Sequence, residues 1–441
     1  MNIILLSGGS GKRLWPLSNE VRSKQFLEIF KKEDGSHESM AQRMYRMIRE
    51  TDPGAVVTIA TGQGQIPQIR AQLGEAVGIS VEPARRDTFP AIALAAAYLK
   101  KNGVKDDESV VVCPVDPYVN EDYFACLKEM ADEAGKANLT LMGIEPTCPS
   151  TKFGYIIPAS VSHISPVREF REKPDEKTAE KYIAEGALWN GGVFAFKLSY
   201  LLKITRSLLG TDVYDELYSG YEKLQKISFD YAVAERENNI NVIRFNGEWN
   251  DLGTWDMLTE VMADSISGNA VAAGCENTHV VNELSIPLIA LGVRDVLIAA
   301  TPDGILVSDK EASSKLKDYV VSARPMYEQR SWGEYRVLDE KIHEDGKSSL
   351  VKELTIGAGK HISYQRHKLR TEIWTFTEGI GELILDGETK RVSRGDVVVI
   401  RPGTKHAIRG ITQIRIIETQ IGEKLTEEDI ERLDWDWEKE V

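Results

Sequence analysis

The chain has 441 residues, and its 54 basic and 68 acidic side chains give a formal net charge of −14. With 42% hydrophobic and 28% charged residues, the composition is that of a folded globular protein, which excludes a disordered, collagen-like or coiled-coil chain. The negative balance argues against nucleic acid or an anionic membrane as a standing partner, although local basic residues could still bind a small anion. At roughly 150 residues per domain, the length predicts two or three domains.

The cysteines and the first residues favour a cytoplasmic protein. Four cysteines in so long a chain are too few for a disulfide framework, and their spacing does not suit a metal site. The apolar stretch at residues 3–6 ends at glycines, far short of a signal sequence, and no run is long enough to span a bilayer. A reducing cytoplasm is therefore the predicted compartment.

The first part of the chain alternates strand-like and helix-like segments. Residues 2–9 and 109–115 are short apolar runs typical of buried parallel strands, and residues 90–101 have a helical composition. This alternation predicts an α/β, Rossmann-like doubly wound domain over residues 1–262, with ligands at the carboxyl ends of the strands. The loop after the first strand and Asp116, which follows the later strand, are then expected beside one crevice.

Beyond residue 262 the pattern changes to short apolar pieces separated by turns. Residues 263–325 carry Gly, Pro, Asn or Asp every few positions, which predicts a β-rich, β-helix-like linker segment. Residues 326–441 contain evenly spaced strand candidates with glycine turns, and they predict a β-barrel or jelly roll that ends in a short acidic helix or arm. The β-rich segment could mediate a homodimer.

A glycine-rich loop follows the first strand directly. Gly8, Gly9 and Gly11 would let backbone amides approach phosphate oxygens, because no Cβ intervenes. Arg13 and the nearby Lys24 add the positive charge that a triphosphate clamp needs. The spacing matches neither a Walker loop nor the dinucleotide-binding fingerprint. On these residues alone, a plain tight turn competes with a phosphate site.

The loop opens a longer series of motifs. In chain order they are GGSGKRLWPLSNEVRSKQFL at 8–27, VEPARRDTFPAIALAAA at 81–97, PVD at 114–116, FGYI at 153–156, FREKP at 170–174, WNGGVFAF at 189–196 and WNDLGTW at 249–255. Together they resemble the sugar-1-phosphate nucleotidylyltransferases, in particular the mannose-1-phosphate guanylyltransferase branch, over most of residues 1–262. The resemblance implies transfer of GMP from GTP to mannose 1-phosphate, which gives GDP-mannose and pyrophosphate.

The chemistry of this reaction assigns four residues. The attacking phosphate oxygen is already ionised, so the task is to bring two polyanions together in line, which a Mg²⁺ ion held by carboxylates assists. Asp116 and Asp251 are the predicted ligands of this Mg²⁺, and the resemblance points to the same pair. Without the resemblance, a helix N-cap or a turn would explain Asp116, and an Asx turn before Gly253 would explain Asp251. Arg13 and Lys24 are predicted to bind the triphosphate and to stabilise the departing pyrophosphate.

The resemblance also assigns residues to the two substrates. The predicted nucleotide-binding residues are Leu6, Gly8, Gly9, Gly11, Lys12, Arg13, Glu82 and Arg86. The predicted sugar-phosphate-binding residues are Gly154, Glu172, Lys173 and Asn190. A carboxylate accepts hydrogen bonds from sugar hydroxyl groups and a lysine suits the sugar phosphate, whereas a solvated turn before Pro174 is the alternative for Glu172 and Lys173.

Three positions depart from the family's usual pattern. Ser23 stands where the family usually has Pro, Asp87 stands where Asn is usual, and Pro117 follows Asp116 where His is usual. None of these changes removes an acid or a cation of the predicted site. They bear on the substrate preference more than on the type of reaction.

The predicted barrel holds a second candidate site. Gln365, His367 and Glu372 approximate the pattern His-x-His-x₄-Glu with Gln in the first place, and His406 follows later. QRHKLRTEIW at 365–374 resembles the isomerase-type cupin domain of guanylyltransferase/phosphomannose isomerase enzymes. This ligand set would suit Zn²⁺ or another divalent transition metal. The resemblance implies a metal-dependent mannose-6-phosphate isomerase, but histidines of the family string are missing, so a non-catalytic cupin used for packing or dimerisation is the alternative.

Two alternatives to guanylyl transfer stay open at this stage. The same fold could serve another nucleoside triphosphate and sugar 1-phosphate, with a cupin that has no catalytic role. A sugar-nucleotide sensor that binds without turnover belongs to a different class of protein. The presence of Arg13, Lys24, Asp116 and Asp251 speaks against a sensor, because a binding protein does not need the whole in-line clamp.

Overall fold

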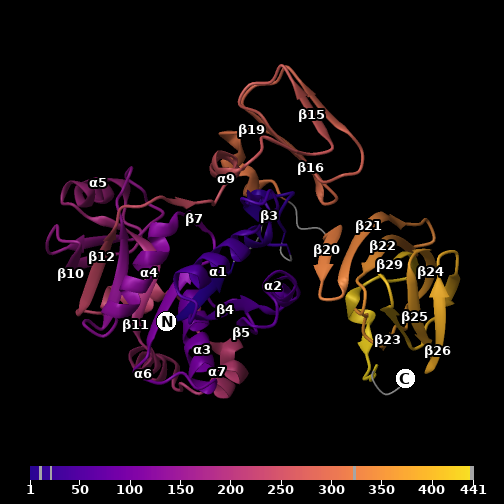
Figure 1. Ribbon diagram of the computed structural model, residues 1–441, viewed down its shortest axis with the longest axis horizontal. Helices are drawn as coiled ribbons and strands as arrows, with labels where there is room; N and C mark the ends of the chain where they lie inside the picture. Colours follow the sequence, from indigo (N-terminus) through magenta and orange to yellow (C-terminus); the bar gives the residue numbers. More distant parts are fainter. Residues whose placement is uncertain (9–11, 20–21, 321–323, 438–441) are drawn as a thin grey trace. The chain divides into compact units, whose positions relative to one another are not determined.

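The computed structural model describes residues 1–8, 12–19, 22–320 and 324–437, with Lys12 described in its backbone only (Figure 1). The chain divides into two compact units. One consists of Met1–Ser265 with Asp309–Asp318, and the other of Ile266–Ser308 with Tyr319–Val441. The β-rich segment expected over residues 263–325 is thus shared between the two units. No helix among the described residues is both long and apolar enough to cross a bilayer.

The first unit is built on a nine-stranded mixed sheet. In spatial order its strands are β5 (Gly78–Glu82), β4 (Val56–Gly62), β1 (Asn2–Ser7), β6 (Ser109–Pro114), β11 (Leu188–Lys197), β8 (Leu139–Ile144), β12 (Ile240–Phe245), β10 (Ile164–Arg171) and β9 (Tyr155–Pro158). The first four run parallel, and β11 runs antiparallel to both of its long neighbours. β1 has a parallel partner on each side, and its side chains belong to the cores on both faces of the sheet, so it is almost wholly buried, which explains its continuous apolar run.

Helices cover both faces of this sheet, so the predicted doubly wound α/β fold is confirmed. Side chains of α1 (Met40–Thr51), α2 (Ile66–Leu73), α4 (Glu121–Glu133) and α5 (Glu176–Ala184) belong to one core. Those of α3 (Thr88–Lys101), α6 (Leu198–Leu209) and α8 (Phe229–Ala232) belong to the other. α3 is buried nearly all round because α6 and α7 (Tyr214–Gly220) pack on it from outside, which accounts for its alanine-rich sequence.

Shorter elements complete this unit. They are β2 (Phe30–Lys31), β3 (His37–Glu38), β7 (Pro117–Val119), β13 (Trp249–Asp251), α9 (Trp255–Val261) and the 3₁₀ helices η1 (Lys12–Leu14), η2 (Lys24–Phe26), η3 (Gln63–Gln65), η4 (Tyr221–Lys223), η5 (Ala234–Arg236) and η6 (Ala312–Asp318). The carboxyl ends of the parallel strands lie at one edge of the sheet. Ser7, Pro114 and Glu82 therefore end their strands on the same side.

The second unit begins with short strands that stack in parallel. β14 (Ile266–Gly268), β16 (His279–Asn282) and β18 (Val296–Thr301) form one ladder, which β19 (Gly304–Asp309) extends, and β15 (Ala270–Ala273) pairs with β17 (Leu288–Leu291). Successive parallel strands joined by tight turns are the β-helix-like arrangement that the sequence predicts. The exception is η6, which is helical rather than extended and belongs to the first unit.

The rest of the second unit is a barrel of two sheets, as predicted. The six-stranded sheet contains β20 (Tyr327–Arg330), β21 (Gly333–Ile342), β22 (Ser348–Ile356), β29 (Ile414–Gly422), β24 (Arg370–Glu378) and β27 (Val397–Ile400). The five-stranded sheet contains β26 (Glu388–Ser393), β25 (Ile380–Leu385), β28 (His406–Gly410), β23 (Gln365–Arg366) and β30 (Glu431–Arg432). Their inner faces share one apolar core. The C-terminal segment forms the 3₁₀ helix η7 (Glu427–Asp429) and the edge strand β30.

Candidate active site and metal centre

Two acids from distant parts of the sequence lie close together in the first unit. Asp116 lies between the end of β6 and the start of β7, and Asp251 ends β13. β13 pairs antiparallel with β7, and this pairing places Asp251 opposite Pro117, the neighbour of Asp116. The Nζ atom of Lys24 lies 2.7 Å from Oδ2 of Asp116 and 3.8 Å from Oδ1 of Asp251. The structure therefore brings three of the four predicted catalytic side chains around one point.

This group of charges has the chemistry of a divalent cation site. The Asp116 and Asp251 side chains are 30% and 39% exposed, so their oxygens can be reached from solvent. Mg²⁺ prefers carboxylate oxygens and usually keeps several water ligands, which a partly open site allows. The ammonium of Lys24 offsets one of these two negative charges, and it also donates a hydrogen bond to the carbonyl of Leu252 at 3.2 Å. The residues present fit a Mg²⁺ ion.

Arg13, the fourth predicted catalytic residue, lies beside Asp251. A Cβ atom placed on Gly253 would be 3.4 Å from Oδ2 of Asp251 and 3.5 Å from a terminal nitrogen of Arg13, so both groups border the same glycine. Arg13 is exposed on η1. The indole nitrogen of Trp255 donates a 3.0 Å hydrogen bond to the carbonyl of Trp15, which fixes the chain after η1 against the start of α9.

The predicted phosphate loop is only partly described. Gly9, Gly11 and the side chain of Lys12 lie outside the described residues. Gly8 directly follows β1, and a Cβ added there would meet no atom within 4 Å. The carbonyl of Leu6 accepts a hydrogen bond from the amide of Val115 at 3.2 Å, which connects β1 to the segment leading to Asp116.

Two of the predicted nucleotide-binding residues, Glu82 and Arg86, contact the same short helix, η4, and the sequence does not reveal this. Glu82 ends β5, and its carboxylate accepts a 2.7 Å hydrogen bond from the hydroxyl of Tyr221 in η4. Burial raises the pKa of the Glu82 carboxyl. Arg86 donates through Nε to the carbonyl of Glu222 at 3.1 Å. η4 thus holds both side chains at the end of β5, and Tyr221 is a neighbour that no motif indicated.

Asp87, which stands where the family usually has Asn, serves as the N-cap of α3. Asp87 caps α3, accepting a 2.8 Å hydrogen bond from the amide of Thr88, and its φ is 70°. Asp and Asn adopt positive φ more readily than most residues and both carry a capping oxygen. Either residue therefore serves this helix start.

The four predicted sugar-phosphate residues lie together. The amide of Asn190 donates to the carbonyl of Gly154 at 2.8 Å, and Nζ of Lys173 lies 2.7 Å from Oε1 of Glu172. A Cβ on Gly154 would come within 2.5 Å of Oε2 of Glu172, whose side chain is only 5% exposed. Glycine is therefore required here, because the buried carboxylate has little room to move.

Asp230 is a member of this group that sequence reasoning missed. Its Oδ1 accepts a 2.7 Å hydrogen bond from Nδ2 of Asn190. Burial raises the pKa of the Asp230 carboxyl to about 6, and the negative charge of Glu172 adds to the effect. An acid in the first turn of a helix such as α8 is ordinarily explained by the helix dipole, so no sequence pattern singles it out.

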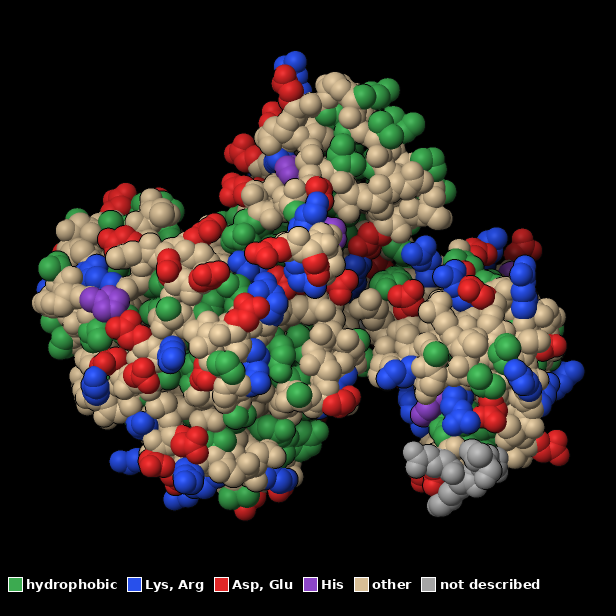
Figure 2. Space-filling model, in the orientation of Figure 1, with side chains coloured by type: hydrophobic (Ala, Val, Ile, Leu, Met, Phe, Trp, Pro, Cys, Tyr) green, Lys and Arg blue, Asp and Glu red, His purple; other side chains and the backbone are tan. Residues whose placement is uncertain are grey.

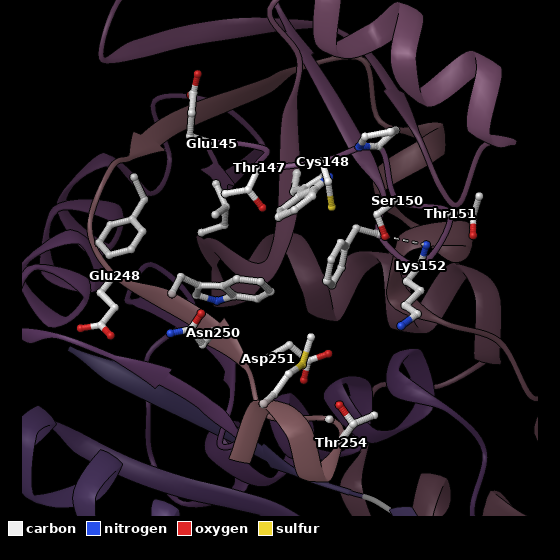
Figure 3. A pocket seen from close by; sticks show the side chains of 18 of the residues that line it. Glu145, Thr147, Cys148, Ser150, Thr151, Lys152, Glu248, Asn250, Asp251 and Thr254 are labelled. Atoms are coloured by element: carbon white, nitrogen blue, oxygen red, sulfur yellow. Dashed lines mark hydrogen bonds between the residues drawn. The ribbon is translucent and has the colours of Figure 1, made fainter. Parts of the chain in front are cut away.

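A large pocket lies beside Asp251 (Figure 3). It adjoins the clamp, the group of charged residues formed by Arg13, Lys24, Asp116 and Asp251. Its volume is about 1130 Å³, and Arg13 and Asp251 line one side of it. Phe153, Trp189 and Trp249 also line it, and the ring of Phe153 lies 4.9 Å from that of Trp189 and 5.6 Å from that of Trp249, centroid to centroid. The first unit therefore has room for a large polar ligand beside its charged residues.

The barrel holds a second, fully buried cluster. His367, Glu372 and His406 offer ligand atoms within 4.8 Å of one another. The Nε2 atoms of His367 and His406 lie 3.3 Å and 3.7 Å from the oxygens of Glu372, and neither makes a hydrogen bond. Nδ1 of His367 lies 3.1 Å from the carbonyl of Arg370, and Nδ1 of His406 lies 3.0 Å from that of Thr404. A carbonyl can only accept, so each Nδ1 carries a proton, and in the neutral form of the ring each Nε2 presents a lone pair.

Lone pairs facing a buried carboxylate repel it unless a cation lies between them. Two imidazole nitrogens and a carboxylate, oriented by carbonyl groups behind the rings, are the donor set and the support that Zn²⁺ and similar ions take. Burial lowers the pKa of His406, which favours the neutral ring that a metal needs. Gln365, the fourth predicted ligand, lies opposite His406 in the sheet. Unlike the Nε2 atoms of the two histidines, its Oε1 already has a partner, because it accepts a hydrogen bond from the hydroxyl of Ser363 at 3.0 Å.

Sequence reasoning also missed the polar side chains around this cluster. The indole nitrogen of Trp374 lies 3.2 Å from Oε2 of Glu372 and 3.1 Å from Oε2 of Glu418, and Arg370 donates to Oε1 of Glu372 at 2.8 Å. Burial raises the pKa of Glu418 to about 7. These residues occupy inward positions of β24 and β29, where polar residues are visible only once the strand phase is known.

Comparison with known proteins agrees with these sites. The family model described as nucleotidyl transferase matches residues 2–268. The chain belongs to the nucleotidyl transferase family. A second model, described as mannose-6-phosphate isomerase C-terminal, matches residues 321–435 of this nucleotidyltransferase. The chain is therefore an enzyme of the class that transfers a nucleotidyl group to a sugar phosphate, with a cupin-like C-terminal domain.

Individual relatives cover nearly the whole chain. The xanthan biosynthesis protein XanB of Xanthomonas campestris pv. campestris (strain B100) is 31% identical over 98% of this chain and 97% of its own. The mannose-1-phosphate guanylyltransferase RfbM of Salmonella typhimurium (strain LT2) is 30% identical over 98% of this chain and 96% of its own. A crystal structure from Thermus thermophilus, described as a mannose-1-phosphate geranyltransferase, has a TM-score of 0.61 and 28% identity and covers 72% of this chain and 97% of its own.

The raised pKa of Asp230 predicts a pH-dependent stability difference for Asp230→Asn. The folded protein holds this proton to about pH 6, whereas an unfolded aspartate releases it near about pH 4. The folded state thus binds more protons in this window, and its stability falls as pH rises through it. The variant cannot titrate and still accepts from Asn190, so it should gain stability relative to the wild type by up to about 3 kcal/mol between these pH values.

Urea unfolding of both proteins at several pH values measures this difference. Asp264→Asn is the control, because Asp264 is a half-exposed acid of the same unit. A difference between wild type and Asp230→Asn that stays constant with pH would contradict the assignment.

Proposed function

We propose that this enzyme transfers GMP from GTP to mannose 1-phosphate, giving GDP-mannose and pyrophosphate, with Mg²⁺ as its cofactor. The observation that carries the proposal is the placement of Lys24 between Asp116 and Asp251, beside Arg13. The choice of GTP and mannose 1-phosphate is supported by full-length relatives that bear the name mannose-1-phosphate guanylyltransferase. GDP-mannose would thus be the product released together with pyrophosphate.

On the nucleotide side, the residues of the clamp have distinct tasks. Asp116 and Asp251 would hold Mg²⁺, which when bound neutralises charge on the phosphoryl oxygens. Lys24 and Arg13 pair with the triphosphate and oppose the charge that develops on the departing pyrophosphate. Glu82 and Arg86, held by η4 at the end of β5, would border the nucleoside.

On the sugar side, two carboxylates lie close enough to influence each other, and one of them accepts a hydrogen bond from Asn190. Glu172 and Asp230 can accept hydrogen bonds from sugar hydroxyl groups, and Lys173 can pair with the sugar phosphate. The phosphate oxygen of the sugar is ionised at neutral pH, so it attacks without a general base. The enzyme's contribution is to orient it in line with the α-phosphorus.

The buried cluster of the barrel supports a second activity, a metal-dependent isomerisation of mannose 6-phosphate. The two unpartnered Nε2 atoms aimed at Glu372 carry this proposal, and the isomerase family model supports the substrate. His367, Glu372 and His406 would hold Zn²⁺ or another divalent transition metal, which when bound polarises a sugar carbonyl. Gln365 could become a fourth ligand if it released Ser363.

An apolar patch supports a homodimer. On the two-stranded sheet of β15 and β17, Val271 is paired with Ile289 and Ala273 with Leu291. The three larger side chains are well exposed: Val271 is 58% exposed, Ile289 66% and Leu291 66%. Figure 2 shows hydrophobic side chains gathered on the lobe that contains these strands. Contiguous exposed apolar side chains are typical of protein interfaces, and we propose a second copy of this chain as the partner.

A screen of nucleoside triphosphates against sugar 1-phosphates, followed by pyrophosphate release, tests the proposed reaction. GTP with mannose 1-phosphate should be the best pair. Asp251→Asn should lower kcat/KM by at least about a hundredfold while GTP affinity stays within about tenfold, because the carboxylate acts through the metal. Asp264→Asn, a surface control in the same unit, should match the wild type. A clear preference for UTP or CTP with another sugar phosphate would refute the substrate assignment.

Metal analysis tests the cupin site. The purified chain should carry about one transition-metal ion per molecule, as a closed cluster of His and Glu ligands does. The double variant His367→Ala/His406→Ala should lose this ion, whereas His343→Ala, a histidine exposed on the same barrel, should keep it. Equal metal content in all three proteins would contradict the ligand assignment.

Sedimentation equilibrium tests the dimer. The wild type should sediment as twice the chain mass, and Ile289→Glu/Leu291→Glu should convert it to a monomer, because each charge would be buried in the interface. Val397→Glu is the matched control, since Val397 is 59% exposed on the barrel. A dimer that survives the double variant would place the interface elsewhere.

A further inference from the structure

A buried network of side chains ties the residues next to Lys24 to the sheet. Its members are Ser7, Ser23, Gln25, Thr61 and Gln65, each no more than 6% exposed. They come from the end of β1, from η2 and the residue before it, from β4 and from η3. The apolar packing of β1 and β4 therefore extends through hydrogen bonds to the segment that carries Lys24.

Gln65 is the centre of this network. Its Oε1 accepts hydrogen bonds from the hydroxyl groups of Thr61 at 2.7 Å and Ser7 at 3.0 Å. Its Nε2 donates to the hydroxyl of Ser23 at 2.6 Å. Gln25 donates through Nε2 to the hydroxyl of Ser7 at 3.0 Å and lies 3.4 Å from Oε1 of Gln65. Each of the five side chains has at least one hydrogen-bond partner within the network, as buried polar groups require.

The two residues that flank Lys24 in the chain are thus both bonded into one network. On one side of Lys24, the hydroxyl of Ser23 accepts a hydrogen bond from the side-chain amide of Gln65. On the other side, the side-chain amide of Gln25 is hydrogen-bonded to Ser7 and Gln65. The lysine backbone is fixed from both sides while its Nζ reaches Asp116. The hydroxyl of Ser23 is needed for this, and a proline at that position could not provide an acceptor.

We infer that Gln65 is a positioning residue for nucleotidyl transfer, which acts by holding the backbone of Lys24 so that its ammonium faces Asp116 and Asp251. This inference rests on the proposed role of Lys24 in the transfer reaction. Gln65 touches neither acid in the described contacts, and its effect on the reaction passes through Ser23 and Gln25. Loss of its amide leaves buried hydroxyl groups without partners and frees the lysine segment to shift.

Gln65→Met tests this role because methionine has a similar length and cannot form these hydrogen bonds. A shift of about 1 Å at a reacting group can cost about a hundredfold in rate, so kcat should fall by about tenfold to a hundredfold. KM for mannose 1-phosphate should stay within about twofold, since the sugar residues belong to other elements. Ser23→Ala, which removes only the acceptor, should change kcat in the same direction and by less.

Gln68→Met is the matched control. Gln68 is fully buried in α2, three positions from Gln65, and its amide atoms have no hydrogen-bond partner in the described part of the chain. This control removes a buried glutamine amide without touching the network. Its kcat should match the wild type, and thermal melting should show all variants folded.

A double-mutant cycle with Lys24→Met separates positioning from general stability. If Gln65 acts through Lys24, Gln65→Met should cost at least about tenfold less in single-turnover rate when Lys24 is already methionine. An equal cost in both backgrounds would overturn the inference. If Lys24→Met itself leaves the transfer rate unchanged, the proposed role of the clamp fails instead, which distinguishes the two failures.

Discussion

The ion pairing of Lys24 with the two acids Asp116 and Asp251 is the interaction around which the candidate site of the first unit is built. Three partly solvated charges from three distant segments stay together only if each backbone is fixed independently. β6 presents Asp116, the pairing of β13 with β7 presents Asp251, and the network around Gln65 holds the lysine segment. The parallel half of the sheet supplies the common edge from which these elements project.

The sequence predicts the elements whose local pattern is unambiguous. The apolar run of β1, the glycines after it and the strand before Asp116 follow from composition and from the geometry of parallel sheets. Asp251 does not follow in this way, because its position depends on a three-residue strand that pairs with a partner far away in the chain. The family resemblance supplied what local physics could not.

The sequence alone could not predict residues whose role depends on partners from other helices or strands. Tyr221, Asp230 and Glu418 are ordinary residues in sequence, and they acquire their roles through burial beside Glu82, Asn190 and Trp374. Their shifted pKa values arise from desolvation, which no single-sequence pattern encodes. In the barrel, spacing predicted His367, Glu372 and His406, whereas the neighbouring Glu418 required the strand register.

We propose that Asp116 and Asp251 together hold the cation used in nucleotidyl transfer. Anomalous scattering from a crystal grown with Mn²⁺ and GTP tests it most directly, because Mn²⁺ accepts the same oxygen ligands as Mg²⁺. We expect a Mn²⁺ peak within coordination distance of both carboxylates, with the ammonium of Lys24 turned toward the phosphates. A peak elsewhere, with Lys24 still paired to Asp116, would contradict it.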